Sequence, residues 1–239
     1  MKPTQASARR PAASEDTQGR AWGLPEAVAN LHYFDRDVGA MAVKLLPAQY
    51  HVTTTGTVLT TVLGSCVAAC LLDVEAGVAG MNHFMLADDA ESAPRADAAS
   101  MRYGPFAMDL LIRAMVRAGA RRERLRAKVF GGGAVLANMT TLNIGERNAD
   151  FVLRYLRAEG IGIAAQDLRG QHARRVYFMP DSGKAIVRRI SATDDVQQVQ
   201  RVEGEMVRGL VPGTEPAPGR PSGAMPLAPG AVAKIRGNR

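Results

Sequence analysis

The sequence predicts a single α/β domain, a mixed layered sandwich of β-sheets with packed α-helices. Two observations indicate this class. Apolar segments of strand length, bounded by Gly, Pro and Asp, occupy both halves of the chain, and two amphipathic helical segments lie between them. The chain has 239 residues, of which 46% are hydrophobic, enough for a sizeable core. We expect the domain to span residues 29–195.

The two ends of the chain differ from this domain in composition. Residues 1–28 are polar and rich in Ala, Ser, Arg and Pro, and we expect a disordered extension. Residues 196–239 are expected to begin with a short helix and to end as a disordered, Pro- and Gly-rich basic tail. Neither end is assigned a function.

The first strands are predicted at residues 41–46 and 49–55, where alternating residues are interrupted by Pro47 and Gly56. Residues 60–86 follow as a tight Gly-Ser-Cys corner and two apolar strands joined by a turn. Gly77 can take the positive φ that this turn needs. The hairpin holds the residues to which we assign chemistry.

Two helices follow the hairpin. The first begins at Gly104, with Pro in its first turn, and the second covers residues from about 146 to Gly160. A strand over 127–130 lies between them and ends in a run of three glycines, 131–133. Because the run lacks the Lys of a phosphate-binding loop, we interpret it as a tight backbone corner next to the site. Three further strands complete the domain, at 161–167, 174–179 and 184–190.

The predicted hairpin brings a cysteine and a histidine to one face of a sheet. If Asp73 pairs with Val78, then Ala68 lies opposite His83. Cys66 precedes Ala68 by two residues, so it is a diagonal neighbour of His83 on the same face. An imidazole in this position can take the proton of a thiol. The same pair also fits a structural interpretation, with a packed thiol and a core histidine.

Such a pair needs two further groups for chemistry. A partner must fix the imidazole tautomer, and Thr60 and Thr61, on the strand before the corner, each offer a hydroxyl. The backbone N–H groups of Ser65 and Cys66, in a turn that begins at Gly64, are placed to converge on an oxyanion. Together these groups describe acyl transfer from an amide or ester to a cysteine.

Residues 60–68, TTVLGSCVA, and 80–86, GMNHFML, resemble the signature of the CheD family of chemoreceptor glutamine deamidases. The resemblance continues downstream through FGGG at 130–133, IGERN at 144–148, EGI at 159–161 and RRVYF at 174–178. It covers roughly residues 40–190 in the family's order and spacing. One departure is Arg169, where the family more often has a glycine.

The resemblance implies a protein-glutamine glutaminase that converts selected glutamines of methyl-accepting chemotaxis receptors to glutamate and releases ammonia. The family uses a Cys-His-Thr triad and a thioester. The matching residues are Cys66, His83 and Thr60, the last assigned by its place six residues before the cysteine. Gly64 and Ser65 complete the oxyanion corner.

Other functions remain open at this point. The chain could be a non-enzymatic chemotaxis adaptor that binds receptors or a CheC-type phosphatase, a glutamyl methylesterase, or a general cysteine hydrolase such as a peptidase. We expect no cofactor and no metal, because the four histidines show no metal-ligand spacing with other donors.

The net charge of +7 raises nucleic-acid binding as a competing hypothesis. The densest basic run consists of Arg113, Arg117, Arg121, Arg122, Arg124, Arg126 and Lys128. We expect no nucleic-acid partner, because the chain shows no recognition helix, zinc spacing or paired aromatics. No apolar run approaches the ~20 residues that a membrane span requires, and two cysteines make no disulfide framework. We therefore expect a cytoplasmic monomer.

Overall fold

The computed structural model describes residues 27–85, 103–134, 144–190, 197 and 201. Its strands and helices in chain order are β1 (Leu31–Asp35), β2 (Ala40–Lys44), β3 (Gln49–Thr53), β4 (Val58–Leu63), β5 (Val67–Asp73), β6 (Val78–His83), α1 (Gly104–Arg117), the 3₁₀ turn η3 (Arg122–Arg124), β7 (Arg126–Gly131), α2 (Ile144–Ala158), β8 (Gly162–Leu168), β9 (Ala173–Met179) and β10 (Lys184–Ile190). The two terminal extensions, including the helix expected after residue 196, fall almost wholly outside the described residues.

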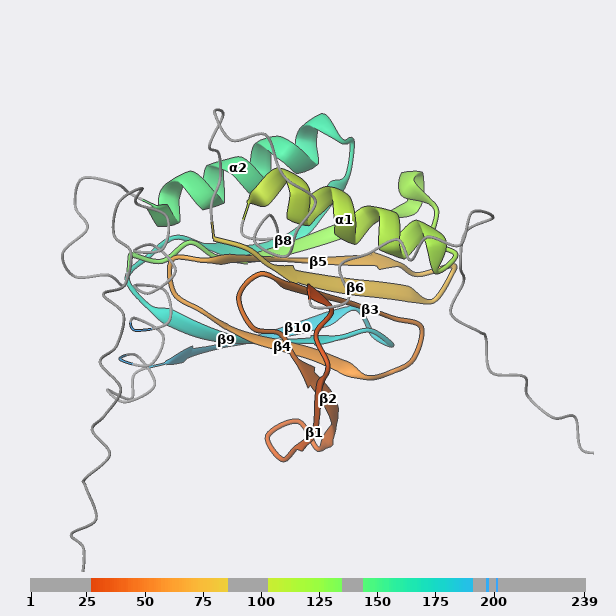
Figure 1. The fold of residues 1–239 in the computed structure, drawn as a ribbon, viewed down its shortest axis with the longest axis horizontal. Coiled ribbons are helices and arrows are strands. Elements are labelled where there is room, and N and C mark those ends of the chain that lie inside the picture. The colour runs from red at the N-terminus through yellow and green to blue at the C-terminus, as the bar shows by residue number, and fades with distance from the viewer. Residues whose placement is uncertain (1–26, 86–102, 135–143, 191–196, 198–200, 202–239) are drawn as a thin grey trace, which may run out of the picture.

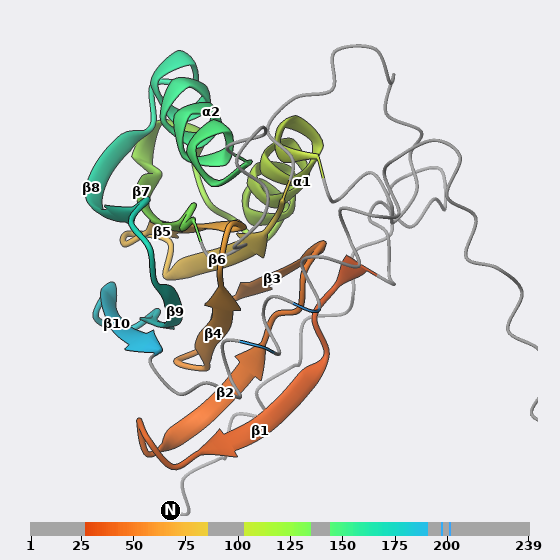
Figure 2. The same cartoon turned by 90° about the vertical axis from the view of Figure 1, so that its left-hand side faces the viewer.

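These elements form three layers (Figure 1). Two five-stranded sheets lie face to face, in the orders β1-β2-β4-β9-β10 and β3-β6-β5-β7-β8. Both helices cover the outer face of the second sheet, and Figure 2 shows β5 and β6 between that helical layer and the other sheet. This arrangement confirms the predicted α/β layered sandwich. Strand β1 has no counterpart in the prediction, because it is a short edge strand with mostly exposed side chains.

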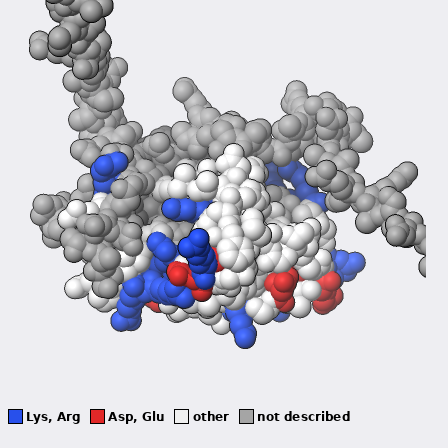
Figure 3. Space-filling model, turned by 90° about the horizontal axis from the view of Figure 1, so that it is seen from below, with Lys and Arg blue, Asp and Glu red and all other residues white. Residues whose placement is uncertain are grey.

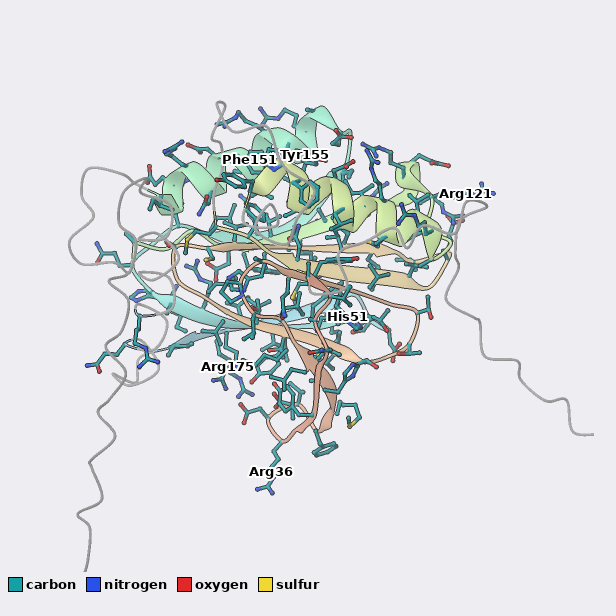
Figure 4. The ribbon with its side chains drawn as sticks, viewed as in Figure 1. Arg36, His51, Arg121, Phe151, Tyr155 and Arg175 are labelled. Atoms are coloured by element: carbon teal, nitrogen blue, oxygen red, sulfur yellow. The ribbon has the colours of Figure 1, made fainter. Side chains whose placement is uncertain are left out.

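The helical layer packs on the second sheet through an aromatic contact close to the end of β6. Phe84 follows β6 directly, and its ring lies 5.7 Å from that of Phe151 in an edge-to-face arrangement. Figure 4 shows Phe151 and Tyr155 on α2, and their rings are also 5.7 Å apart. Gly104 at the start of α1 lies so close to Phe151 that an added Cβ would come within 2.3 Å of the ring. The two helices are thus anchored beside the strand that carries His83.

The turn after β8 contains the residue that departs from the family pattern. Arg169 has a φ of 67°, a left-handed conformation that costs roughly 1–2 kcal/mol for a residue other than glycine. Several contacts hold it there. Its N–H donates to the Gly131 carbonyl at 2.8 Å, and its carbonyl accepts from Arg174 at 2.6 Å. Its guanidinium also forms an ion pair with Asp150.

The dense basic run is partly neutralised by internal ion pairs. Arg113 pairs with Asp109, Arg122 with Glu159, and Arg124 with two carboxylates. On the outer face of the first sheet, Lys and Arg side chains also lie beside Asp and Glu (Figure 3). Within the residues that the structure describes, no helix is long and apolar enough to cross a membrane.

Asp73 is a buried carboxylate that ties the β5–β6 turn to the segment before β7. It accepts hydrogen bonds from the backbone N–H groups of Ala76 and Arg121, at 3.1 and 2.8 Å. Arg124 donates to it through Nε and Nη2, at 3.0 and 2.9 Å. Burial alone raises the pKa of the Asp73 carboxyl, but these hydrogen bonds outweigh it, so the pKa lies below its usual value.

We expect Asp73→Asn to lower the free energy of unfolding at neutral pH by roughly 2–3 kcal/mol, because it leaves Arg124 without its buried partner. The control is Asp109→Asn, which removes an exposed helical ion pair and is expected to cost less than about 0.5 kcal/mol. Denaturant titrations would measure both values. A carboxyl with a lowered folded pKa stabilises the protein above its unfolded pKa of about 3.9. The difference in the free energy of unfolding between wild type and Asp73→Asn should therefore become smaller as the pH falls below that value. A difference that does not change with pH would contradict the lowered pKa of Asp73.

Candidate active site

The hairpin of β5 and β6 has the register that the sequence predicted. Asp73 is paired with Val78 at the turn end of the ladder. At the other end, Val67 and Phe84 exchange backbone hydrogen bonds of 2.9 and 3.0 Å. Both pairs belong to one register, so no slip of one residue separates the two ends.

This register puts Cys66 and His83 on the face of the second sheet that packs against the first. Cys66 and Ala68 belong to the core cluster between the sheets, as do Ala79 and Met81 of β6. Alternation along β6 therefore directs His83 to the same side. Diagonal neighbours on one face have Cα atoms roughly 7–8 Å apart. Both side chains are buried, with 0% of Cys66 and 1% of His83 exposed.

The imidazole of His83 is held by Thr61 from the opposite sheet. Thr61 Oγ1 lies 2.8 Å from His83 Nδ1 and donates its own proton to the Leu45 carbonyl at 2.9 Å. A hydroxyl has one proton to donate; with that proton on the Leu45 carbonyl, Oγ1 accepts a hydrogen bond from Nδ1–H, and we assign the ring this tautomer. The other ring nitrogen, Nε2, then carries the lone pair. It is buried and has no hydrogen-bond partner among the residues that the structure describes.

Burial determines the charge of this histidine. Desolvation lowers the pKa of His83 from 6.5 to about 3, and the nearby Leu45 carbonyl, which favours the protonated ring, opposes this only in part. The imidazole is therefore neutral at physiological pH. Any thiol–imidazole chemistry here starts from an uncharged histidine that accepts a proton, and not from a standing imidazolium.

Thr60, which the family resemblance assigned to the imidazole, lies on the other face of β4. It is paired with Tyr177 of β9, and Tyr177 forms a small outer cluster with Val58. Because side chains alternate along a strand, only one of two successive threonines can face the core between the sheets. The structure brings Thr61, not Thr60, to His83.

The predicted backbone corner is built from two glycine-containing segments that meet. Gly133 N–H donates to the Gly64 carbonyl at 2.7 Å, and Gly132 N–H donates to the Cys66 carbonyl at 2.8 Å. Gly131 has a φ of 111°, and a Cβ added there would lie 2.1 Å from the Cys66 carbonyl oxygen. Only glycine permits this close approach. The glycine run thus lies against the cysteine corner, as the sequence predicted.

Two buried polar residues next to this corner were not singled out from the sequence. Asn148 of α2 donates through Nδ2 to the Ser65 carbonyl at 2.9 Å. Arg174 of β9 donates through Nη1 to the Gly131 carbonyl at 2.7 Å, and burial lowers the pKa of its guanidinium. Both residues lie in segments that carry the family resemblance, IGERN and RRVYF, and this was the available signal.

Cys70 shares the inter-sheet cluster with Cys66 but has a different environment. It is buried among apolar side chains, and desolvation raises the pKa of its thiol well above the usual value. It is therefore a packed thiol, as its position in an apolar strand predicted. In the part of the chain that the structure describes, no group of three or more His, Cys, Asp or Glu side chains could hold a metal ion.

The His83 geometry predicts a ring that stays neutral, with its proton on Nδ1, from pH 8 down to about pH 4. Nitrogen-15 NMR of the imidazole would show a pyridine-type Nε2 throughout this range. The ring gains its proton near pH 6.5 in the unfolded chain but only near pH 3 in the folded protein. Between these values the unfolded state binds a proton that the folded state does not, so the free energy of unfolding falls as the pH drops from 6.5 toward 3. A ring that gains a proton near pH 6.5 in the folded protein would contradict the assignment.

Known proteins resemble this chain over most of its length. The model for the family described as CheD chemotactic sensory transduction matches residues 85–189. A probable chemoreceptor glutamine deamidase CheD of Cupriavidus pinatubonensis is 61% identical over 198 residues, which cover 82% of this chain and 91% of that protein. A protein of the same name in Cupriavidus metallidurans is 59% identical over 198 residues, with coverages of 82% and 90%.

Among solved structures, the hypothetical protein YfiH of Bacillus licheniformis matches at 13% identity over 49% of each chain, with a TM-score of 0.28. That similarity is too low to inform the fold. The family is established by the sequence relatives, which are 61% and 59% identical to this chain over 82% of its length. The chain belongs to the CheD family.

Proposed function

We propose that this protein deamidates selected glutamine side chains of methyl-accepting chemotaxis receptors, with Cys66 as nucleophile and His83 as general base. The relatives' names, chemoreceptor glutamine deamidase, support the substrate class. The observation that carries the chemistry is the buried Nε2 of His83, which has no hydrogen-bond partner among the described residues and belongs to a side chain on the same sheet face as Cys66. A neutral, oriented imidazole beside a cysteine is the arrangement that acyl transfer to sulfur needs.

In the first half of the reaction, His83 Nε2 takes the thiol proton as the sulfur of Cys66 bonds to the carboxamide carbon. The carbonyl oxygen becomes an oxyanion, which we assign to the backbone N–H groups of Ser65 and Cys66 at the corner that follows Gly64. The imidazolium then gives its proton to the nitrogen. The C–N bond breaks, ammonia leaves, and a thioester remains.

In the second half, His83 accepts a proton from water, whose oxygen attacks the thioester carbon. The C–S bond breaks, the imidazolium returns its proton to the sulfur, and the receptor residue leaves as glutamate. Thr61 keeps the imidazole in the required tautomer through both halves, because its hydroxyl accepts from Nδ1–H. Thr61 therefore replaces Thr60 in the proposed triad.

The proposal predicts a mass gain of about one dalton for each modified glutamine, with release of one ammonia, when a receptor cytoplasmic fragment is incubated with the protein. Intact-mass analysis and an ammonia assay would measure both. Cys66→Ala and His83→Ala should abolish the gain. Cys70→Ala, a buried thiol four residues further along the same face, is the matched control and should retain it.

Three results would separate this function from its alternatives. A new amine terminus in place of the mass gain would indicate a peptidase. Release of methanol from a methylated fragment, with a decrease in its mass, would indicate a methylesterase. Tight receptor binding without any change in mass would indicate an adaptor.

The two threonines provide a second test. We expect Thr61→Val to lower kcat by about 10- to 100-fold, because the imidazole loses the acceptor that fixes its tautomer. Thr60→Val, the same change on the opposite face of β4, should stay within about threefold of wild type. Steady-state rates on the same receptor fragment would measure both. The reverse order of effects would return the role to Thr60.

The finer expectations rest on the family resemblance. We infer a cytoplasmic site of action, where the thiols of Cys66 and Cys70 stay reduced, and a monomeric chain. A CheC-type phosphatase is a further proposed partner. Size-exclusion chromatography with and without such a phosphatase tests the last two expectations.

A further inference from the structure

Asn148 is a buried asparagine whose side chain holds the peptide group that leads into Cys66. Its Nδ2 donates to the Ser65 carbonyl at 2.9 Å, and none of its surface is exposed. The Ser65 carbonyl and the Cys66 N–H belong to one planar trans peptide, so they point in opposite directions. A hydrogen bond that fixes the carbonyl toward α2 therefore fixes the Cys66 N–H away from it. The orientation of the Cys66 Cα–Cβ bond also depends on this peptide plane.

The carbonyls on either side of this one are held differently. Gly64 and Cys66 carbonyls accept hydrogen bonds from backbone N–H groups of Gly133 and Gly132, at 2.7 and 2.8 Å. The Ser65 carbonyl accepts from a side chain. A single substitution can therefore remove the Asn148 hydrogen bond to the Ser65 carbonyl while both neighbouring backbone hydrogen bonds remain.

A second asparagine shows what a purely structural role looks like. Asn82, also fully buried, uses both ends of its amide: Oδ1 accepts from Ala69 N–H at 3.0 Å, and Nδ2 donates to the Ala107 carbonyl at 3.1 Å. Asn148 uses only Nδ2, because Oδ1 has no partner among the described residues. An unpaired buried acceptor is unfavourable; an apolar side chain of similar size would avoid it, but it would also take this donor away from the Ser65 carbonyl. Packing alone does not account for an asparagine at this position.

We propose that Asn148 is a positioning residue of the active site, which orients the Ser65–Cys66 peptide for attack and for oxyanion stabilisation. The inference rests on the proposed deamidase function for its kinetic consequence. It assigns the effect to the acylation step, in which the Cys66 sulfur and N–H must meet the carboxamide carbon and oxygen together.

The test uses Asn148→Leu, which keeps the side-chain size, and Asn148→Ala. Val152→Ala is the control, since Val152 is a buried α2 residue one turn further along. For both Asn148 variants we expect kcat to fall about 10- to 100-fold, with KM for the receptor fragment within about threefold of wild type. Alkylation of Cys66 by iodoacetate should stay within about threefold, because displacement of iodide forms no oxyanion. The Val152→Ala variant should lose thermal stability and keep its kcat.

A readout that does not depend on enzymatic activity completes the test. The backbone amide resonance of Cys66 should shift in Asn148→Leu and remain in place in Val152→Ala. The inference is overturned if a folded Asn148→Leu keeps the wild-type kcat and Cys66 resonance, or if kcat, alkylation and melting temperature all fall in proportion. Failure of the proposed function would look different. Wild type itself would then produce no glutamate, and the Cys66 resonance would still decide whether Asn148 orients the peptide.

Discussion

The hydrogen bond between Thr61 and His83 is the contact on which the candidate site depends. It joins β4 of one sheet to β6 of the other. Because the Thr61 hydroxyl donates its proton to the Leu45 carbonyl, we assign His83 Nδ1–H as the donor to Thr61. In this tautomer the lone pair of the ring is on Nε2. This contact requires the two sheets to pack at their present spacing. The core between them therefore positions the His83 ring and also stabilises the fold.

Burial also determines the charge of His83. A neutral imidazole is favoured over an imidazolium, which is why the pKa of His83 falls to about 3. In the proposed reaction, charge then appears only as the substrate reacts, and the groups that stabilise it must already be oriented. The three successive carbonyls of Gly64, Ser65 and Cys66 are each held by a partner from a distant part of the chain. This arrangement stiffens the backbone around Cys66, the proposed nucleophile.

Much of the architecture followed from local patterns. The register of β5 and β6 came from a turn at Gly77 and two apolar runs, and one pairing, Asp73 with Val78, was enough to align Cys66 with His83. The glycine run after β7 was correctly placed beside the cysteine corner because its positive φ and its lack of side chains suit close backbone contact. The edge strand β1, which pairs on one side only, carried no comparable pattern.

The sequence by itself determined the fold class, the helices, most strands and the cysteine–histidine pair, since each depends on residues close together in the chain. Only the tertiary structure decided between Thr60 and Thr61, because that choice depends on which face of β4 meets the other sheet. It also brought the Asn148 side chain to the Ser65 carbonyl, 83 residues away in the chain. Contacts between distant segments depend on how the layers pack, and no local pattern of apolar and polar residues encodes them.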